Sequence, residues 1–250
     1  MEKQKNQLVI HDQLVNYYQF GYGKKTIIFL HGWRSNAEAW FGVITQLLNK
    51  DFKIYCLDLP GFGSSPVPYR PYSVGDYAAI VTGFMEKRCL LNSYLVGHSF
   101  GGRIAIKIAS ENPKLVDRLI LVDSAGIKKE FTSRKKLAKI VKPIFKPEIM
   151  KKLRSRIYSA MGAEDYLATP ELQGTYIKVI GEDLTDNLQS IKCKTLLIWG
   201  EDDKETPVAD AEIINHGIER SRLEIIEDAG HFSFIDKPNE FVKIFKEFIE

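Results

Sequence analysis

The sequence predicts an α/β fold in which a mostly parallel central sheet is covered by helices on both faces. Short aliphatic runs alternate with longer amphipathic stretches along most of the chain, and this alternation is typical of such a sheet. The later aliphatic runs are nearly continuous in apolar character, as strands buried on both faces are. The composition, 44% hydrophobic and 27% charged over 250 residues, is that of a globular protein rather than a disordered or collagen-like chain.

The chain opens with a predicted hairpin. Leu8–Ile10 and Leu14–Phe20 are apolar runs joined by the polar turn His11-Asp12-Gln13. Six more strands are expected after it, with amphipathic helices between them, because β-branched and aliphatic runs recur between segments of helical spacing. The strands are Thr26–Leu30, Lys53–Leu57, Tyr94–Val96, Leu119–Val122, Thr195–Trp199 and Leu223–Ile226, and the helices span 37–49, 73–90, 100–110, 207–217 and 238–249.

The alternation breaks between residues 126 and 190. The pattern there is helical and rich in lysine, and three prolines interrupt it. We therefore expect a helical cap over 126–190, inserted into a core made of 1–125 and 191–250.

The formal net charge of +3 hides an asymmetry. Residues 126–156 hold twelve Lys or Arg and two Glu, so this segment carries +10 and the rest of the chain −7. Apolar residues recur at helical spacing within it, which favours a solvated helix face over a ligand site. Attraction of an anionic ligand is the alternative. Because no nucleic-acid motif with interleaved aromatics is present, we expect no nucleic-acid partner.

Other features exclude further classes. No run approaches the roughly 18 apolar residues of a membrane span, and the polar N-terminus does not resemble a signal peptide. Cys56, Cys89 and Cys193 are far apart, and neither C-x-x-C nor H-E-x-x-H occurs, so we expect neither a metal nor another cofactor. These observations predict a cytoplasmic protein.

The most informative stretch is Tyr94-Leu-Val-Gly-His-Ser-Phe-Gly-Gly102. It places G-x-S-x-G directly after a predicted strand and directly before a predicted helix. Such a sharp turn requires small residues because backbones approach closely and the central residue is strained. Ser99 would stand clear of the sheet at a helix N-terminus, where developing negative charge is favoured. The pattern therefore indicates a nucleophilic serine.

In this context the chain resembles the α/β-hydrolase superfamily, over essentially its whole length. Four further segments match in order and each follows a predicted strand: His31-Gly-Trp33, Asp58–Ser65, Gly200–Pro207 and Gly230-His231-Phe232. The resemblance implies an α/β-hydrolase fold with a cap, and a Ser, Asp, His triad in that chain order.

The resemblance implies that His231, in the loop after the last strand, is the general base. His98 is expected to point away from Ser99, and His31 to order a loop. The family pattern G-x-x-D-x-x-x-P selects Asp203 as the acid that orients His231. The other histidines are His11 and His216, and the alternative acids are Asp123, Asp202 and Asp228.

An oxyanion hole is expected from the backbone N–H groups of Trp33 and Phe100. The side chains of Trp33, Phe100 and Phe232 either line an apolar acyl pocket or belong to the core. The cap would contribute further lining residues, of which some pack the cap onto the core. These candidates are Phe131, Ile140, Ile144, Phe145, Met150 and Met161.

Serine at the turn argues against the dehalogenases and epoxide hydrolases of this fold, which carry aspartate there. We expect hydrolysis of a small-molecule carboxylic ester or thioester through an acyl-enzyme on Ser99. A carbon–carbon bond hydrolase is one alternative, although those enzymes usually have Asn where this chain has His98. A small-molecule receptor without turnover is another. An anionic substrate is a further hypothesis if the basic cap face rims the entrance.

Overall fold

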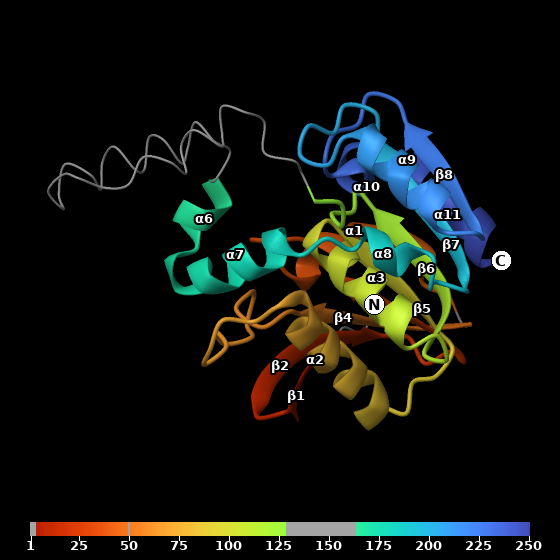
Figure 1. Cartoon of the computed structure of the whole chain (residues 1–250). Helices are drawn as coiled ribbons and strands as arrows, with labels where there is room; N and C mark the ends of the chain where they lie inside the picture. The colour runs from red at the N-terminus through yellow and green to blue at the C-terminus, as the bar shows by residue number, and fades with distance from the viewer. Residues whose placement is uncertain (1–3, 50, 129–163) are drawn as a thin grey trace, which may run out of the picture.

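The computed structural model describes residues 4–49, 51–128 and 164–250. Its strands form an eight-stranded sheet in the order β1-β2-β4-β3-β5-β6-β7-β8 (Figure 1). β2 is antiparallel to both of its neighbours, and every other pair is parallel. This confirms the predicted, mostly parallel sheet. The strands are β1 (Gln4–Ile10), β2 (Gln13–Phe20), β3 (Lys25–Leu30), β4 (Phe52–Asp58), β5 (Ser93–His98), β6 (Val116–Val122), β7 (Lys194–Gly200) and β8 (Ser221–Ile226).

The N-terminal hairpin turns at His11 and Asp12, whose φ angles are 47° and 62°. Positive φ at both central residues matches the right-handed twist of the flanking strands. β1 begins four residues before the predicted Leu8. Its first residues alternate between exposed and half-buried positions on an edge strand, so they carry no continuous apolar signal.

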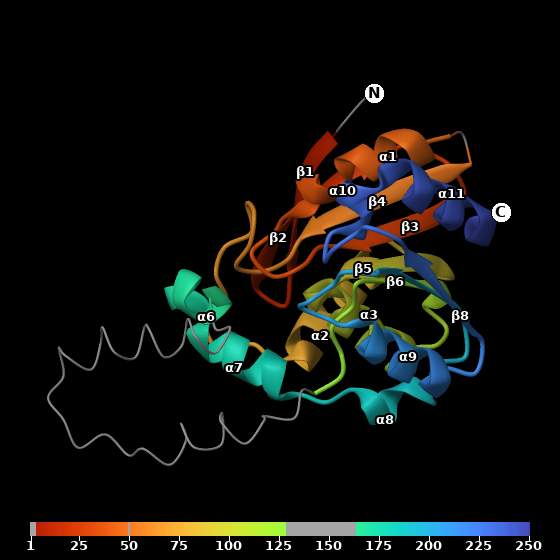
Figure 2. The same cartoon turned by 90° about the horizontal axis from the view of Figure 1, so that it is seen from above.

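Two hydrophobic clusters lie on opposite faces of the sheet. Along β3, Ile28 and Leu30 belong to one cluster, whereas Ile27 and Phe29 belong to the other. This alternation follows from the two-residue repeat of a strand and explains why β3 is apolar throughout. The first face is covered by α2 (Val74–Lys87), α3 (Phe100–Glu111), α8 (Thr185–Leu188) and α9 (Val208–Gly217), and the second by α1 (Phe41–Leu47), α10 (Ser233–Asp236) and α11 (Pro238–Ile249) (Figure 2).

The helices begin and end close to the predicted positions. α2 begins after Ser73, whose hydroxyl accepts the N–H of Asp76 while the Asp76 carboxylate accepts the N–H of Ser73; this capping box fixes the first turn. The core helices are η1 (Ala37–Trp40), α1 (Phe41–Leu47), α2 (Val74–Lys87), α3 (Phe100–Glu111), α9 (Val208–Gly217), α10 (Ser233–Asp236) and α11 (Pro238–Ile249).

Within the described part of 126–190 the regular structure is helical, in agreement with the predicted pattern. The elements are α6 (Glu164–Ala168), η2 (Pro170–Leu172), α7 (Gln173–Gly181) and α8 (Thr185–Leu188). Figures 1 and 2 both place α6 and α7 beside the loop that precedes α2. The Thr175 hydroxyl accepts the N–H of Tyr72 at 3.0 Å, and Lys178 donates to the carbonyl of Pro71 at 2.9 Å. The division into core and cap stays a prediction.

Six of the predicted lining residues fall outside the described residues: Phe131, Ile140, Ile144, Phe145, Met150 and Met161. Across the ranges that the structure describes, no helix combines the length and the apolar character needed to cross a bilayer.

Candidate active site

Ser99 occupies the turn between β5 and α3, with φ of 49° and ψ of −110°. Such a backbone conformation costs a non-glycine residue about 1–3 kcal/mol. The flanking glycines allow the turn to be this tight. A Cβ at Gly97 would lie 2.4 Å from the carbonyl oxygen of Gly101, and one at Gly101 would lie 2.5 Å from that of Leu30. The strained serine is therefore held where the helix packs directly onto the strands.

His231 and Asp203 come together from the loops that follow β8 and β7. The Nδ1 atom of His231 lies 2.8 Å from Oδ2 of Asp203. The other carboxylate oxygen accepts the N–H groups of Glu205 at 2.8 Å and Thr206 at 3.0 Å, and the Thr206 hydroxyl lies 2.6 Å from Oδ2. These donors fix the carboxylate, and so they also fix the imidazole that binds to it.

Asp203 and His231 shift each other's pKa in opposite directions. Burial raises the pKa of Asp203. The hydrogen bond and charge of His231, together with the hydroxyl and N–H of Thr206, lower it, and the net direction is downward. Burial lowers the pKa of His231, whereas Asp203 and then Glu205 raise it, and the net direction is upward. Neutral His231 therefore carries its proton on Nδ1 toward Asp203, which leaves Nε2 as an acceptor.

Asp123 follows β6 and is fully buried, yet its carboxylate does not reach His231. Oδ1 accepts the N–H of Gly200 at 2.8 Å, and Oδ2 accepts the N–H and hydroxyl of Ser233 at 3.1 and 2.6 Å. Burial, offset by these donors and reinforced by the charge of Asp203, raises the pKa of Asp123 to about 7. Asp123 thus ties two loops of the site together rather than orienting the histidine.

The remaining candidate acids and histidines lie elsewhere. Asp202 and Asp228 are exposed, and Asp228 pairs with Lys237 at 3.4 Å. His216 is on α9, where its ring contacts the carbonyl of Glu212, and His11 forms the N-terminal turn. Of the four aspartates proposed from the sequence, Asp203 is the one whose carboxylate contacts His231.

Two buried histidines order the loops around Ser99. Burial lowers the pKa of His98 to about 3, so its ring is neutral, and Nε2–H donates to the carbonyl of His231 at 2.7 Å. Burial also lowers the pKa of His31 to about 4. Its Nε2 accepts the N–H of Leu59 at 3.0 Å, and its Nδ1–H donates to the carbonyl of Gly32 at 2.7 Å. His98 therefore does more than pack, because it holds the backbone of His231.

The backbone N–H groups of Trp33 and Phe100 have no acceptor among the described residues. Phe100 is the first residue of α3, and an N–H at that position has no partner within a helix. These are the two donors expected from the sequence to form the oxyanion hole.

An aromatic cluster lies beside the turn. The ring of Trp33 meets Phe62, Phe100 and Tyr176 edge-on, at centroid distances of 4.9, 5.2 and 5.3 Å. Phe100 is only 3% exposed and is part of the main core, whereas Phe232 is 39% exposed. Of the three aromatic residues predicted to line the pocket, Trp33 and Phe232 are therefore the more accessible. Tyr176 on α7, which was not predicted, contacts the ring of Trp33.

Ser99 Oγ makes no hydrogen bond within the described part of the chain. Nε2 of His231 lies instead 3.4 Å from Oε2 of Glu205. The spacing pattern that selected Asp203 gives no weight to Glu205 or Thr206. Both follow Asp203 within the same turn, so a carboxylate and a hydroxyl so close to the predicted acid were the signal that could have identified them.

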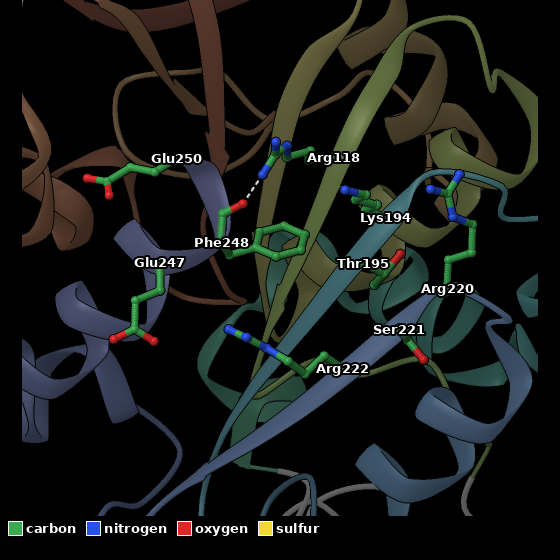
Figure 3. Close-up of a pocket in the computed structure, with 9 residues that line it drawn as sticks. All are labelled: Arg118, Lys194, Thr195, Arg220, Ser221, Arg222, Glu247, Phe248 and Glu250. Carbon is green, nitrogen blue, oxygen red and sulfur yellow. Dashed lines mark hydrogen bonds between the residues drawn. The ribbon is translucent and has the colours of Figure 1, made fainter.

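A cleft of about 420 Å³ lies at the opposite end of the sheet (Figure 3). It opens where β6, β7 and β8 begin, whereas Asp123, Asp203 and His231 follow the ends of those strands. Its charged lining residues are Arg118, Lys194, Arg220, Arg222, Glu247 and Glu250. It is therefore separate from the predicted site. Among the described residues, no three His, Cys, Asp or Glu side chains gather as metal ligands would.

The chain is similar to known esterases and to a phospholipase over nearly its whole length. The chain is 27% identical to a pimeloyl-[acyl-carrier protein] methyl ester esterase of Aeromonas hydrophila, over 92% of this chain and 97% of the relative. It is 31% identical to the enzyme of the same name from Wigglesworthia glossinidia brevipalpis, over 92% and 95%. The crystal structure of a membrane phospholipase A, described as a bacterial virulence factor, superposes with a TM-score of 0.81 at 25% identity, covering 99% of this chain and 86% of that one.

A sequence model described as the alpha/beta hydrolase family matches residues 27–244. This range runs from β3 to α11 and includes Ser99, Asp203 and His231. The chain therefore belongs to the alpha/beta hydrolase family.

Proposed function

We propose that this protein is a serine esterase that hydrolyses the carboxylic ester of a small molecule through an acyl-enzyme on Ser99. One observation carries the proposal: the 2.8 Å hydrogen bond between His231 and Asp203, on the same edge of the sheet as the strained turn of Ser99. Two relatives with ester hydrolysis in their names support the same class of substrate. A thioester would undergo the same chemistry.

In the proposed acylation, neutral His231 accepts the proton of Ser99 at Nε2 while the Ser99 oxygen bonds to the carbonyl carbon of the ester. Asp203 stabilises the imidazolium that forms. The negative oxygen of the tetrahedral intermediate accepts hydrogen bonds from the N–H groups of Trp33 and Phe100, each worth about 3–4 kcal/mol in comparable sites.

The intermediate collapses when the bond to the leaving oxygen breaks and His231 gives its proton from Nε2 to that oxygen. The alcohol leaves, and the acyl group stays on Ser99. Water then repeats the sequence: His231 takes its proton, the hydroxide oxygen bonds to the acyl carbon, and Ser99 leaves with the proton returned by His231. Trp33 and Phe232 are proposed to contact the acyl chain, with residues of the predicted cap.

The test is hydrolysis of p-nitrophenyl esters from acetate to dodecanoate, by the wild-type protein and by Ser99→Ala. We expect many turnovers by the wild type, with a preferred acyl length, and loss of at least about a thousandfold in the variant. The exposed Ser64→Ala is the control and should retain activity. Full activity in Ser99→Ala would contradict the proposal, and a single turnover by the wild type would indicate a receptor.

A further inference from the structure

The cleft at the opposite end of the sheet brings three cationic side chains to one level of three neighbouring strands. Arg118 of β6 is the register partner of Lys194 of β7. Arg220 directly precedes Ser221, the partner of Thr195, and the Arg220 carbonyl accepts the N–H of Thr195 at 2.9 Å. The three cations therefore lie side by side, with their backbones about 4.8 Å apart from one strand to the next.

These side chains share the face of the sheet that α11 covers. Side chains in register point to the same face, and those two residues apart along a strand do so as well. Arg118 is two residues before Ile120, which belongs to the cluster that contains Phe245 of α11. Arg222 follows Arg220 by two residues and lines the same cleft. The fold thus gathers four cations on one face, beside the end of α11.

Two of the four cations have partners within the protein. Arg118 donates to the carbonyl of Phe248 in the last turn of α11, and its guanidinium lies 5.4 Å from the centre of the Phe248 ring. Nε of Arg118 is also 4.0 Å from Asp117, and this arginine side chain is only 21% exposed. Arg222 lies 3.1 Å from Glu224. Arg118 is therefore fixed by packing, and Arg222 is paired on its own strand.

Lys194 and Arg220 are in a different situation. Both are exposed, and neither side chain forms an ion pair or a hydrogen bond within the part of the chain that the structure describes. Like charges opposite one another on neighbouring strands are destabilising, and Lys194 is flanked by Arg118 and Arg220. An anion that accepts hydrogen bonds from both Lys194 and Arg220 offsets this repulsion.

The two carboxylates of the lining come from α11 and face away from this pair. Figure 3 shows Glu247 and Glu250 on the α11 side of the cleft, with their carboxylates pointing away from Lys194 and Arg220. Among the described residues, neither glutamate forms an ion pair. The cleft therefore has an acidic side on α11 and a basic side where β7 and β8 begin.

We propose that this cleft binds the phosphate group of a phosphomonoester between Lys194 and Arg220. Two unpaired cations match the charge of nearly −2 that such a group carries at neutral pH. The planar guanidinium of Arg220 can donate two parallel hydrogen bonds to phosphate oxygens, and the ammonium of Lys194 supplies a compact charge. The volume of about 420 Å³ admits a small organic group as well.

This inference is independent of the proposed function, because the cleft and Ser99 lie at opposite ends of the sheet. Binding is therefore measured directly, without an assay of ester hydrolysis.

The test is titration calorimetry of the whole protein with glycerol 3-phosphate, and glycerol is the matched probe without charge. We expect saturable binding of glycerol 3-phosphate and none of glycerol. Lys194→Gln and Arg220→Gln should each raise Kd by at least about tenfold, because each removes a hydrogen bond between charged groups. Lys24→Gln changes an exposed lysine outside the cleft, and this control should leave Kd unchanged.

A third variant has an expected effect of the opposite sign. Glu247→Gln removes a negative charge from the α11 side of the cleft, so glycerol 3-phosphate should bind about twofold more tightly. Weaker binding by this variant would contradict a phosphate group held inside the cleft.

Vesicles of phosphatidylcholine, with and without phosphatidic acid, distinguish two sources of the same phosphate group. Binding of glycerol 3-phosphate that Lys194→Gln and Arg220→Gln both weaken supports a soluble phosphomonoester. Sedimentation with the phosphatidic acid vesicles alone, weakened by the same two variants, supports a phosphate group carried by a lipid. Binding of neither probe, or binding that both variants leave unchanged, would overturn the proposal.

Discussion

Two buried aspartates follow neighbouring strands of the sheet, and their carboxylates meet different partners. Asp203 after β7 binds the imidazole of His231 as well as backbone N–H groups. Within the part of the chain that the structure describes, the carboxylate of Asp123 after β6 binds backbone N–H groups and the hydroxyl of Ser233. Burial acts to raise the pKa of both carboxyl groups. The net pKa is nevertheless lowered for Asp203, whereas that of Asp123 is raised to about 7.

Both carboxylates are buried, but their partners differ: His231 is ionisable, whereas Ser233 and the backbone of Gly200 are not. Neutral donors offset only part of the desolvation of Asp123, whereas His231 together with the donors of Thr206 more than offsets that of Asp203. The proposed chemistry creates an imidazolium, which Asp203 would stabilise, and Asp123 holds the loops that carry Gly200 and Ser233.

The largest expected effect comes from Asp203→Asn. The amide can turn its NH₂ toward Nδ1 of His231, which then keeps its proton on Nε2 and cannot accept that of Ser99. We expect kcat/KM for a p-nitrophenyl ester to fall by about ten-thousandfold, the loss known for this change in comparable triads. Asp123→Asn is the matched control in the same assay and should lose far less. Equal losses in the two variants would remove the distinction between the aspartates.

Asp123→Asn should instead act on stability. An amide nitrogen at the position of Oδ2 cannot accept the N–H of Ser233, so a buried donor is left without a partner. We expect the free energy of unfolding to fall by about 2 kcal/mol, measured by urea denaturation. Asp202→Asn, at an exposed position, should stay within about 0.5 kcal/mol of the wild type. A neutral effect of Asp123→Asn would show that its hydrogen bonds contribute little.

His98 offers a smaller effect, because it acts on His231 through the backbone. His98→Phe keeps an aromatic ring but removes the donor to the carbonyl of His231, so the loop loses one restraint. We expect kcat to fall about tenfold with KM nearly unchanged, since a buried acceptor left unpaired costs about 1–3 kcal/mol. His98→Gln restores an N–H and should recover part of the loss. A change confined to KM would contradict this role.

The smallest effect concerns stability against pH. The raised pKa of His231 means that its pairing stabilises the fold below its ordinary value of 6.5 and is lost as the pH rises through the folded value. The lowered pKa of Asp203 means that its share is present above 3.8 and is lost as the pH falls through the folded value. The wild type should therefore be more stable than Asp203→Asn by about 1 kcal/mol, and this difference should be largest between pH 3.8 and pH 6.5. Urea denaturation across that range measures it, and a flat difference would contradict the ion pair.

Much of the fold could be predicted because the buried strands are continuously apolar and the helices are amphipathic. The predicted helix at 238–249 coincides with α11. Element ends are less predictable where local signals conflict. The sequence predicted that this strand ends at Val96, because Gly97 and His98 resemble the start of a turn. In the structure β5 continues for these two residues, since both pair with β6.

The sequence predicted the tight turn at Ser99, where a motif fixes the backbone, and chain order led to His231, which the structure places against Asp203. The catalytic roles of these residues stay predictions. Contacts between residues of different loops or helices could not be predicted. The sequence marks Glu205 only by its nearness to Asp203, and no spacing predicts the contact of Tyr176 with Trp33 or that of the His98 ring with the backbone of His231. Each of these contacts joins residues from different loops or helices, so it depends on the packed structure rather than on spacing.

The most direct test of Ser99 as the nucleophile is the reaction with a fluorophosphonate probe, with the labelled peptide identified by mass spectrometry. We expect one covalent adduct, on the peptide that contains Ser99, and labelling that is lost in Ser99→Ala and slowed at least about a hundredfold in His231→Ala. An adduct on another residue, or labelling of His231→Ala as fast as that of the wild type, would show that Ser99 is not a nucleophile activated by His231 and Asp203.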